Sequence, residues 1–373
     1  MLFKASKEKI ERYISIATSI ISNKPQMHIL TNIVLETEND GINVTSSDLE
    51  MTTRTSFPAA IEREGSITVN GAKFLSIIKS FPSESDIQFE LTDNNEIRIK
   101  SSSSGVKAKY TLRGMPKESY PSAPTTLIDS CSFLLPQFDL KQMIRKTIFS
   151  SSHEDSRRYL NGVYFETEGT SIRLVSSDGR RLALIERELN IDPDLRMKCI
   201  VPQKILHEVS KYLEQDGVVE VCFKENQIYF GFNGIHFLST LIDGTFPNYN
   251  QVIPKTQEKF AIIDRKMFVE SITRSSLLVE DNYNTLKLDF FENHVVLSIN
   301  NADIGSFRDE LSIQYDGEPI ELAFNHKYLQ DYFKEISSEF IIFEMNTPFS
   351  AVSIKAQGED NYIYIVMPMK TDK

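Results

Sequence analysis

The chain has 373 residues, of which 40% are hydrophobic and 25% are charged, a composition typical of soluble globular proteins. No apolar run approaches the roughly 20 residues that a membrane-spanning helix needs, and the first residues lack a signal-peptide apolar stretch. The net charge of −11 argues against a nucleic-acid binder unless basic residues gather on one surface. We therefore expect a cytoplasmic protein in which Cys131, Cys199 and Cys222 are reduced thiols of the core.

A long-period repeat is the most informative feature of the sequence. Residues 30–48 begin Leu-Thr-Asn-Ile-Val-Leu-Glu-Thr, residues 160–178 begin Leu-Asn-Gly-Val-Tyr-Phe-Glu-Thr, and both end in Ser-Ser-Asp. A weaker third copy covers residues 286–301. Because repeats of this length indicate repeated domains, we predict an α+β protein with three similar domains of about 120 residues each. The predicted domains are residues 1–124, 125–254 and 255–373.

Each predicted domain has two helices, one at its start and one in its later half. In all of them apolar residues recur three or four positions apart, the spacing of an amphipathic helix. Ser6, Asn70, Asp264 and Asn325 stand where N-caps are expected, and Pro202 stands at a first turn. Strand-like alternation and a turn follow each second helix, which predicts helices packed on antiparallel sheets. In chain order the apolar stretches of the helices are Ile10–Ile21, Phe74–Phe81, Leu140–Ile148, Ile205–Leu213, Met267–Ile272 and Tyr328–Ile336.

Two proline-containing segments separate the predicted domains. Residues 119–124 contain Tyr120-Pro121, and residues 246–254 contain Phe246-Pro247. Proline and polar residues in these positions favour irregular backbone, so we interpret both segments as linkers. The similar dipeptides at the ends of two domains are further support for the repeat.

The motifs of common catalytic and cofactor sites are absent from the sequence. It has no phosphate-binding glycine loop, no Gly-x-Ser-x-Gly, and six histidines without metal-ligand spacing. Asp178-Gly179 fits a tight turn better than a catalytic carboxylate, and His153-Glu154-Asp155 fits a solvated loop better than a metal site. A hydrolase that uses Asp178, His153 and Asp155 stays as an alternative, although we expect no catalytic residue, no metal and no cofactor.

Basic residues recur on the predicted helices. Lys204 and Lys211 are seven positions apart, as are Lys327 and Lys334, which places each pair on one helix face. A single pair is best explained as part of a solvated helix face. Because basic residues recur over the six helices, a shared basic surface explains them equally well. On a common concave wall these cations would hold DNA phosphates without reading base sequence, with acidic residues outside. A repeat scaffold unrelated to DNA is the other alternative.

Several motifs resemble those of bacterial DNA polymerase III beta subunits, the sliding clamps. Residues 155–169 and 177–183 resemble the central domain of that family. Residues 243–249 and 364–370 are similar to two further signatures, and residues 45–51 are similar to a motif of the first domain. The motifs occur in the family's order and together extend over essentially the whole chain.

The resemblance implies a DNA sliding clamp that performs no chemistry itself. Members of the family form head-to-tail homodimers that close into a ring around double-stranded DNA, with helices inside and sheets outside. A clamp loader opens the ring with ATP, and the ring then confers processivity on the replicative polymerase. The implied partners are the DNA polymerase III alpha subunit, the clamp loader delta subunit, and other polymerases and repair proteins with linear motifs. The implied location is the cytoplasm, in association with the nucleoid and not with a membrane.

The resemblance also assigns residues to three sites by motif match. Family partners insert a short peptide into a pocket between the second and third domains. The pocket residues would be Leu160, Ser177, Gly179, Arg180, Arg181, Leu182, Pro247 and Val252 on one side, and Asn325, Tyr328, Val366, Met367, Pro368 and Met369 on the other. The DNA contacts would be Lys24, His153, Arg157, Arg158, Tyr159 and Lys204. The dimer interface would join Lys107, Lys109, Tyr110 and Leu112 of one copy to Leu277 and Leu278 of the other.

The sequence departs from the family pattern at four places. Arg158 stands where the family commonly has an aromatic residue, and Arg180 stands where it often has histidine. Gln251 occupies a position that is often basic. Residues 302–307 lack the acidic cluster expected opposite the basic residues of the first domain, so apolar contacts would carry more of the dimer interface.

Overall fold

The computed structural model of the chain describes residues 1–22, 24–101, 108–122, 131–189, 192–280 and 284–370, without the side chains of Cys131 and Asp155. These residues form two compact units. Unit 1 comprises Met1–Phe138 and His207–Leu241, and unit 2 comprises Asp139–Leu206 and Ile242–Lys373. The division falls inside the predicted second domain, so the boundaries of the predicted domains stay predictions.

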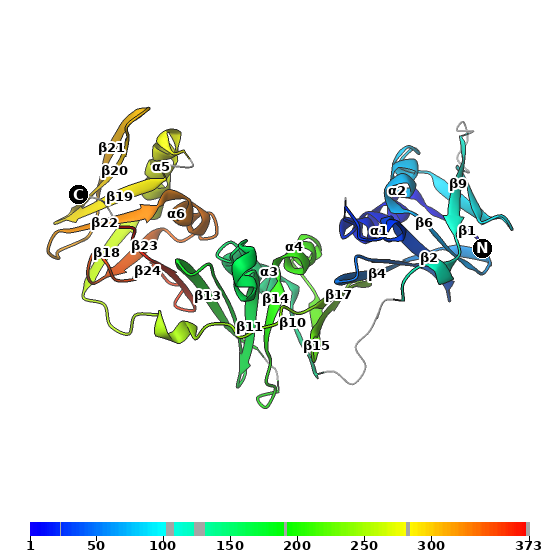
Figure 1. Ribbon diagram of the computed structural model, residues 1–373, viewed down its shortest axis with the longest axis horizontal. Helices are drawn as coiled ribbons and strands as arrows, with labels where there is room; N and C mark the ends of the chain where they lie inside the picture. The colour runs from blue at the N-terminus through cyan, green and yellow to red at the C-terminus, as the bar shows by residue number, and fades with distance from the viewer. Residues whose placement is uncertain (23, 102–107, 123–130, 190–191, 281–283, 371–373) are drawn as a thin grey trace. The chain divides into compact units, whose positions relative to one another are not determined.

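An antiparallel sheet of 13 strands organises unit 1 (Figure 1). The strand order is β10-β15-β16-β17-β4-β3-β2-β6-β9-β8-β7-β1-β5. Pairing of β17 with β4 joins the second repeat to the first, with Ile235 opposite Thr55 and Ser239 opposite Met51. The strands are β1 (Leu2–Ser6), β2 (Asn32–Glu38), β3 (Gly41–Ser47), β4 (Met51–Pro58), β5 (Ala60–Arg63), β6 (Ser66–Asn70), β7 (Asp86–Leu91), β8 (Glu96–Ser101), β9 (Lys109–Met115), β10 (Cys131–Pro136), β15 (Val218–Lys224), β16 (Gln227–Phe232) and β17 (Ile235–Thr240).

Two helices cover one face of this sheet, α1 (Lys7–Ser19) and α2 (Gly71–Lys79) (Figure 1). The apolar stripe of α1 is buried against the sheet at Ile10, Ile14 and Ala17, as its spacing predicts. The stacked rings of Phe3 and Phe89, with centroids 4.5 Å apart, lie in the same core. The two helices and the strands beneath them therefore share one hydrophobic core.

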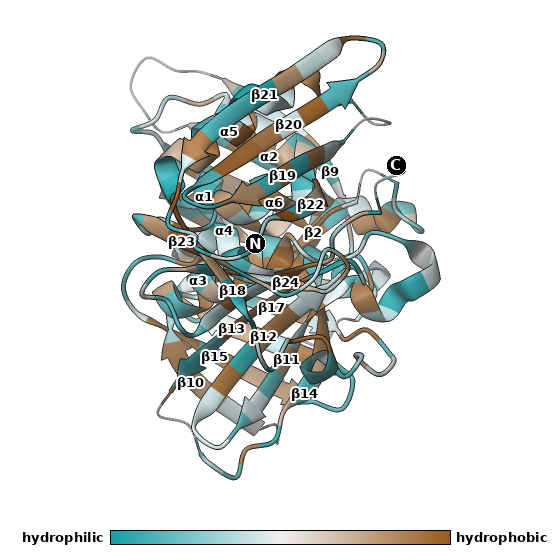
Figure 2. Ribbon diagram, turned by 90° about the vertical axis from the view of Figure 1, so that its left-hand side faces the viewer, coloured by the Kyte–Doolittle hydropathy of each residue, from teal (hydrophilic) through white to brown (hydrophobic). Residues whose placement is uncertain are grey.

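Unit 2 contains an eight-stranded and a four-stranded antiparallel sheet. The orders are β14-β11-β12-β13-β25-β24-β23-β18 and β21-β20-β19-β22. In the larger sheet β13 pairs with β25, which joins the second repeat to the third. Polar and apolar residues alternate along β19 from Thr285 to Phe290 (Figure 2). Leu286, Leu288 and Phe290 are buried, whereas Phe291 at the end of the strand is exposed. The strands are β11 (Gly162–Glu168), β12 (Ser171–Ser177), β13 (Arg181–Glu188), β14 (Lys198–Pro202), β18 (Lys259–Asp264), β19 (Thr285–Phe291), β20 (His294–Asn301), β21 (Gly305–Ser312), β22 (Ile320–Asn325), β23 (Phe340–Met345), β24 (Val352–Ala356) and β25 (Tyr362–Val366).

The two helices of the third repeat, α5 (Arg265–Ser275) and α6 (His326–Phe333), contribute to an aromatic core. Phe268 of α5 meets Phe333 of α6 and Phe343 of β23 edge-on, with centroids 5.2 and 5.4 Å apart. Phe290 of β19 lies 5.7 Å from Phe343, so strands of both sheets reach the same core. Edge-on contacts of this kind stabilise aromatic pairs beyond the area that they bury.

The second repeat contributes α3 (Gln137–Ile148) and α4 (Gln203–Tyr212), which bring the described α-helices to the predicted six. Short 3-10 helices lie between the larger elements and carry several of the predicted site residues. No helix among the described residues is long and apolar enough to cross a membrane. The 3-10 helices are η1 (His28–Thr31), η2 (Lys117–Ser119), η3 (Asp155–Leu160), η4 (Tyr249–Gln251) and η5 (Ser276–Leu278).

Three predicted N-caps are confirmed by hydrogen bonds. Asn70, Asp264 and Asn325 each accept a backbone N–H of the helix that follows, at 3.0, 2.8 and 2.9 Å. Ser6 occupies the N-cap position of α1 without a side-chain bond. Pro202 ends strand β14, where it pairs with Gly162 of β11, instead of occupying the first turn of α4. The thiols of Cys199 and Cys222 are buried as predicted, and the side chain of Cys131 lies outside the described residues.

The same turn occurs at the end of the corresponding strand in all three repeats. Its first polar side chain accepts two backbone N–H groups: Asp48 at 3.0 and 2.7 Å, Asp178 at 2.9 and 3.0 Å, and Asn301 at 3.0 and 3.3 Å. This confirms the tight-turn interpretation of Asp178-Gly179. It also weakens the hydrolase alternative, because the carboxylate is engaged by its own turn.

The turns differ in one residue that takes a left-handed conformation. Gly179 has a φ of 88°, which glycine adopts without cost, whereas Leu49 at the corresponding position has a φ of 80°. A left-handed conformation costs an L-residue about 1–2 kcal/mol. The first repeat therefore holds strain that the second avoids.

We predict that Leu49→Gly raises the free energy of unfolding by about 0.5–1 kcal/mol, because the relieved strain exceeds the entropy that glycine loses on folding. Urea unfolding followed by circular dichroism measures the change. Leu49→Ala is the matched control, since it removes the same exposed side chain but keeps the strain. Equal stability of the two variants would contradict the prediction.

Candidate functional site

A cavity of about 150 Å³ opens in unit 2, next to the turn at Asp178. Its floor is one face of the eight-stranded sheet, where Leu182 of β13 lies opposite Ile365 of β25. The residues that line it are Leu160, Ser177, Gly179, Arg180, Arg181, Leu182, Phe246, Pro247, Asn248, Tyr249, Val252, Ile365 and Met367. Aliphatic and aromatic side chains dominate this lining, as in sites that receive apolar ligand groups.

One wall of the cavity is the segment that the sequence predicts to be a linker. Phe246 stacks on Tyr164 with ring centroids 4.9 Å apart, and the Tyr249 hydroxyl donates to Glu166 at 2.5 Å. Burial and the neighbouring Glu166 carboxylate raise the pKa of the Tyr249 phenol. Aromatic residues of the segment 246–254, which the sequence predicts to be a linker, therefore cover the apolar face of the strands.

The first predicted linker also contains a packed aromatic residue, Tyr120. This residue is buried, and its hydroxyl accepts the backbone N–H of Ser47 at 2.8 Å. Burial raises the pKa of its phenol to about 12, so the group stays a neutral hydrogen-bond partner. Prolines beside each aromatic residue suggested irregular backbone correctly, but an irregular backbone can still be packed.

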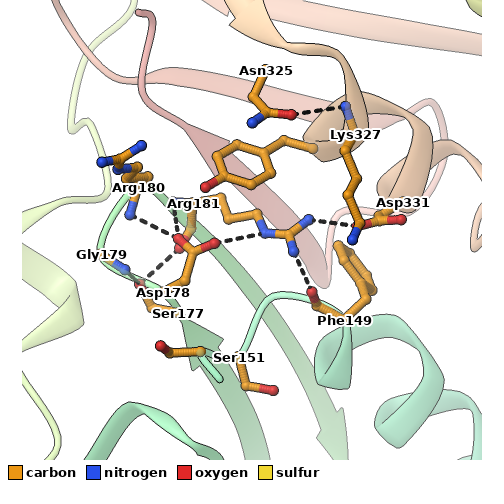
Figure 3. Close-up of polar contacts among 12 residues, drawn as sticks. Phe149, Ser151, Ser177, Asp178, Gly179, Arg180, Arg181, Asn325, Lys327 and Asp331 are labelled. Carbon is orange, nitrogen blue, oxygen red and sulfur yellow. Dashed lines mark hydrogen bonds and ion pairs between the residues drawn. The ribbon is translucent and has the colours of Figure 1, made fainter. Parts of the chain in front are cut away.

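Arg181, which lines the cavity, joins the turn at Asp178 to α6 of the third repeat (Figure 3). Its guanidinium forms ion pairs with Asp178 and Asp331, both at 3.0 Å, and donates to the Phe149 carbonyl at 2.6 Å. The Tyr328 ring lies 4.4 Å from the guanidinium carbon. Only 8% of Arg181 is exposed, so its charge is neutralised within the protein and is not offered to a ligand.

Nine of the predicted pocket residues line this cavity and five do not. Asn325 caps α6, Tyr328 packs on Arg181, and Val366 is buried on the opposite face of β25. The backbone N–H of Met369 donates to Ala323 at 2.7 Å, which holds the Met369 backbone against β22. Pro368, between Met367 and Met369, is also absent from the lining.

Sequence reasoning missed four lining residues, namely Phe246, Asn248, Tyr249 and Ile365. The period of a strand could have found Ile365, because neighbours on a strand face opposite ways and Val366 was chosen in its place. The aromatic residues beside Pro247 could have suggested a packed segment. Whether the lining residues bind a partner stays a prediction.

The residues predicted to contact DNA lie in both units. Lys24 is exposed in unit 1, while η3 and Lys204 belong to unit 2. Tyr159 packs against the hydrophobic cluster under the cavity. His153 and Arg158 are exposed, and Arg157 lies against Gly179, where an added Cβ would be 2.7 Å from its guanidinium. The loop therefore reaches the rim of the cavity.

Several of the recurring helix cations are paired with acidic neighbours. Arg145 binds Glu335 at 3.0 Å and Lys211 binds Glu208 at 2.6 Å, while Lys334 lies 3.8 Å from Asp331. Such exposed pairs contribute little to stability, but they reduce the positive charge that the helices present. The basic surface is therefore weaker than the sequence pattern alone predicts.

The described residues among those predicted for the dimer interface lie on β9 and η5. Leu277 is 82% exposed, an uncommon state for a large apolar side chain. Tyr110 is half-buried against Phe81, and Lys109 is exposed. Lys107 lies outside the described residues. Leu112 on β9 and Leu278 in η5 are both half-buried.

Comparison with known proteins assigns the chain to a family. Models of the N-terminal, central and C-terminal domains of the DNA polymerase III beta subunit match residues 1–124, 134–248 and 250–370. The chain belongs to the DNA polymerase III beta subunit family. This confirms the resemblance and the three-domain α+β fold, and the turn repeated at Asp48, Asp178 and Asn301 is shared by its three domains.

Relatives of this family match over the full length of the chain. The beta sliding clamp of Treponema pallidum is 32% identical over 376 residues and that of Pseudomonas putida is 28% identical, covering 100% and 99% of this chain and all of each relative. Two solved structures cover both chains completely. They are a DnaN sliding clamp from Bartonella birtlesii bound to griselimycin, at a TM-score of 0.94 and 29% identity, and a DNA polymerase sliding clamp from Bacillus subtilis, at 0.95 and 26%.

The family membership and the geometry both disfavour the hydrolase alternative. Both carboxylate oxygens of Asp178 accept hydrogen bonds from the turn and from Arg181. Within the described part of the chain no group of three or more His, Cys, Asp or Glu residues could hold a metal ion. The side chain of Asp155 lies outside the described residues.

We predict that Arg181→Ala lowers the free energy of unfolding by about 3–5 kcal/mol, because it leaves Asp178 and Asp331 without their buried partner. Arg180→Ala, at the exposed neighbouring position, is expected to change stability by less than about 0.5 kcal/mol. Urea unfolding of both variants tests the difference. An equally small effect of both substitutions would show that the ion pairs of Arg181 do not stabilise the fold.

Proposed function

We propose that this chain is a DNA sliding clamp, a homodimer that closes head-to-tail into a ring around double-stranded DNA. The observation that carries the proposal is the match of all three family domains in order along the chain. Relatives named beta sliding clamp match over 99–100% of this chain and over 100% of their own length. The proposed role is to tether the replicative polymerase to its template.

Exposed features of the separate units are consistent with closure by a second copy. The outer strand β21 of the four-stranded sheet is exposed over most of its length, so its unpaired backbone groups are available to another strand. Leu277 offers an apolar anchor in η5. A head-to-tail interface would join such groups to β9 of the second copy and close the ring.

The same proposal places partner peptides in the cavity of unit 2. The expected partners are the DNA polymerase III alpha subunit, the clamp loader delta subunit, and other polymerases and repair proteins that carry apolar linear motifs. The chain itself performs no chemistry in this role, and ATP is used by the clamp loader. The proposed location is the cytoplasm, on the nucleoid.

The ring is tested by retention on nicked circular DNA after loading by a clamp loader with ATP. We predict that the protein stays on circles and leaves once the DNA is cut into a linear form, because a ring can slide off an end. Equal retention on circular and linear DNA would refute encirclement. A clamp of known loading competence is the control for the loader.

The peptide site is tested by Val252→Asp. We predict that this variant binds a short peptide with leucine and phenylalanine anchors at least about tenfold more weakly, because a carboxylate would enter an apolar contact. Calorimetry measures the affinity. Phe260→Asp is the matched control, since Phe260 is exposed to a similar degree, 50% against 49% for Val252, and does not line the cavity. Equal loss in both variants would refute the site.

A further inference from the structure

Unit 1 contains a cavity of about 80 Å³ beside the turn at Asp48, which we call the unit 1 cavity. On its floor Leu238 of β17 lies opposite Thr52 of β4, whereas the floor of the cavity in unit 2 pairs two apolar residues. Pro121 belongs to its lining, as Pro247 does in unit 2. The two cavities therefore occupy corresponding places in the repeats, and the proposed function gives the one in unit 1 no role.

The charge of the turn is reversed between the two units. Residues 177–182 are Ser-Asp-Gly-Arg-Arg-Leu, with one carboxylate and two guanidinium groups. Residues 47–52 are Ser-Asp-Leu-Glu-Met-Thr, with two carboxylates and no cation. Glu50 stands at the position of Arg180, and each of the two lines the cavity of its own unit. A ligand of the unit 1 cavity therefore meets negative charge.

The polar groups of the unit 1 cavity are hydrogen-bond acceptors. Glu50 is its only charged residue among the described lining, is exposed, and forms no ion pair with the described residues. The backbone of Glu50 is fixed, because its carbonyl accepts the Thr240 N–H at 2.9 Å and the Thr240 hydroxyl at 3.2 Å. The hydroxyls of Ser239 and Thr52 likewise donate to oxygens of the protein, at 3.0 and 3.2 Å, so their own oxygens can accept. A ligand that matches this cavity has to donate.

An exposed leucine lies beside these acceptors. Leu49 lines the unit 1 cavity and is 48% exposed, and its φ of 80° is the strained conformation described above. Residues held in strained backbone conformations gather at sites where ligands bind. Leu238 adds a second apolar side chain on the floor. An apolar stem that ends in a cation matches both the leucines and the acceptors.

We propose that the unit 1 cavity is a second partner site, which receives a lysine or arginine side chain from a linear segment of another protein. The cationic head pairs with Glu50 and the hydroxyl oxygens, while the apolar stem packs on Leu49 and Leu238. A cavity of about 80 Å³ suits one side chain and not a folded element. The inference needs neither the proposed DNA ring nor the peptide site of unit 2, because every residue that it uses belongs to unit 1.

Other ligands match the unit 1 cavity less well. A DNA phosphate would be repelled by the carboxylate of Glu50. An inorganic cation would pair with this carboxylate but would leave the apolar surfaces of Leu49 and Leu238 uncovered. A polyamine carries the same ammonium group as lysine, but it lacks the neighbouring residues that could cover Leu49 outside the cavity. Binding of a free amine becomes an outcome of the test.

The test compares acetyl-Gly-Leu-Lys-Gly-amide with the same peptide carrying norleucine, which keeps the stem of lysine but lacks its ammonium group. Titration of the full chain is followed by the NMR shifts of the Thr52 and Thr240 amides. We expect the lysine peptide to bind about two- to fivefold more tightly at low salt, the effect of an exposed ion pair, and salt should shrink this ratio. Glu50→Gln should bring the ratio close to one, and Glu50→Arg should bring it below one. Glu64→Gln is the matched control, since Glu64 is exposed in unit 1 but does not line the cavity.

Leu49→Gly separates binding from folding. This variant is expected above to be more stable than the native protein, so a loss of binding cannot come from unfolding. We expect it to bind both peptides at least about twofold more weakly, because the apolar wall of the cavity is removed. Leu49→Ala should weaken both peptides in the same way while it keeps the strain.

Each other outcome overturns the inference in a different way. Equal binding of both peptides by the native protein, or an unchanged ratio in Glu50→Gln, would show that Glu50 does not select a cation. Shifts at the Leu182 amide without shifts at Thr52 would place the peptides in unit 2. Displacement of the lysine peptide by spermidine, with no effect of Leu49→Gly on either ligand, would assign the cavity to free amines. Binding of neither peptide would refute the site, while the clamp and the peptide site of unit 2 would stay untouched.

Discussion

The structure depends on backbone hydrogen bonding that continues from one repeat into the next. Each unit builds its main sheet from strands of two repeats, through the β17–β4 pair in unit 1 and the β13–β25 pair in unit 2. An unpaired inner strand would expose a row of N–H and C=O groups, so such pairing removes sheet edges that each repeat would otherwise present. For the same reason the compact units do not coincide with the repeats.

The continuous sheet creates a second apolar face that has to be covered. In unit 2 residues 246–252 lie over this face and leave a cavity of about 150 Å³ beside Ser177. In unit 1 the Tyr120 hydroxyl bonds to the backbone of Ser47, the counterpart of Ser177, and the corresponding cavity measures about 80 Å³. The cavity beside this turn is thus larger in unit 2 than in unit 1.

The charge of the cavity follows from the same turn. Asp178 fixes the backbone of the turn and, with Asp331, neutralises Arg181. The preceding residue, Arg180, lines the cavity as an exposed cation. A buried arginine that links two repeats and an exposed arginine therefore stand side by side in the sequence. Their different roles come from burial: the desolvated guanidinium needs both carboxylates, while the hydrated one does not.

The sequence by itself determined the local structure and the repeat. The N-caps at Asn70, Asp264 and Asn325 and the turn at Asp178 depend on contacts within a few residues, so spacing and residue type were sufficient to predict them. The motifs also predicted most of the cavity lining. Only the tertiary structure decided which face of β25 lines the cavity, that Phe246 and Tyr249 are packed, and that Arg181 is buried and neutralised while Arg180 is exposed. These features depend on contacts between residues far apart in the chain, such as Arg181 with Asp331, and such contacts leave no periodic or local signal in the sequence.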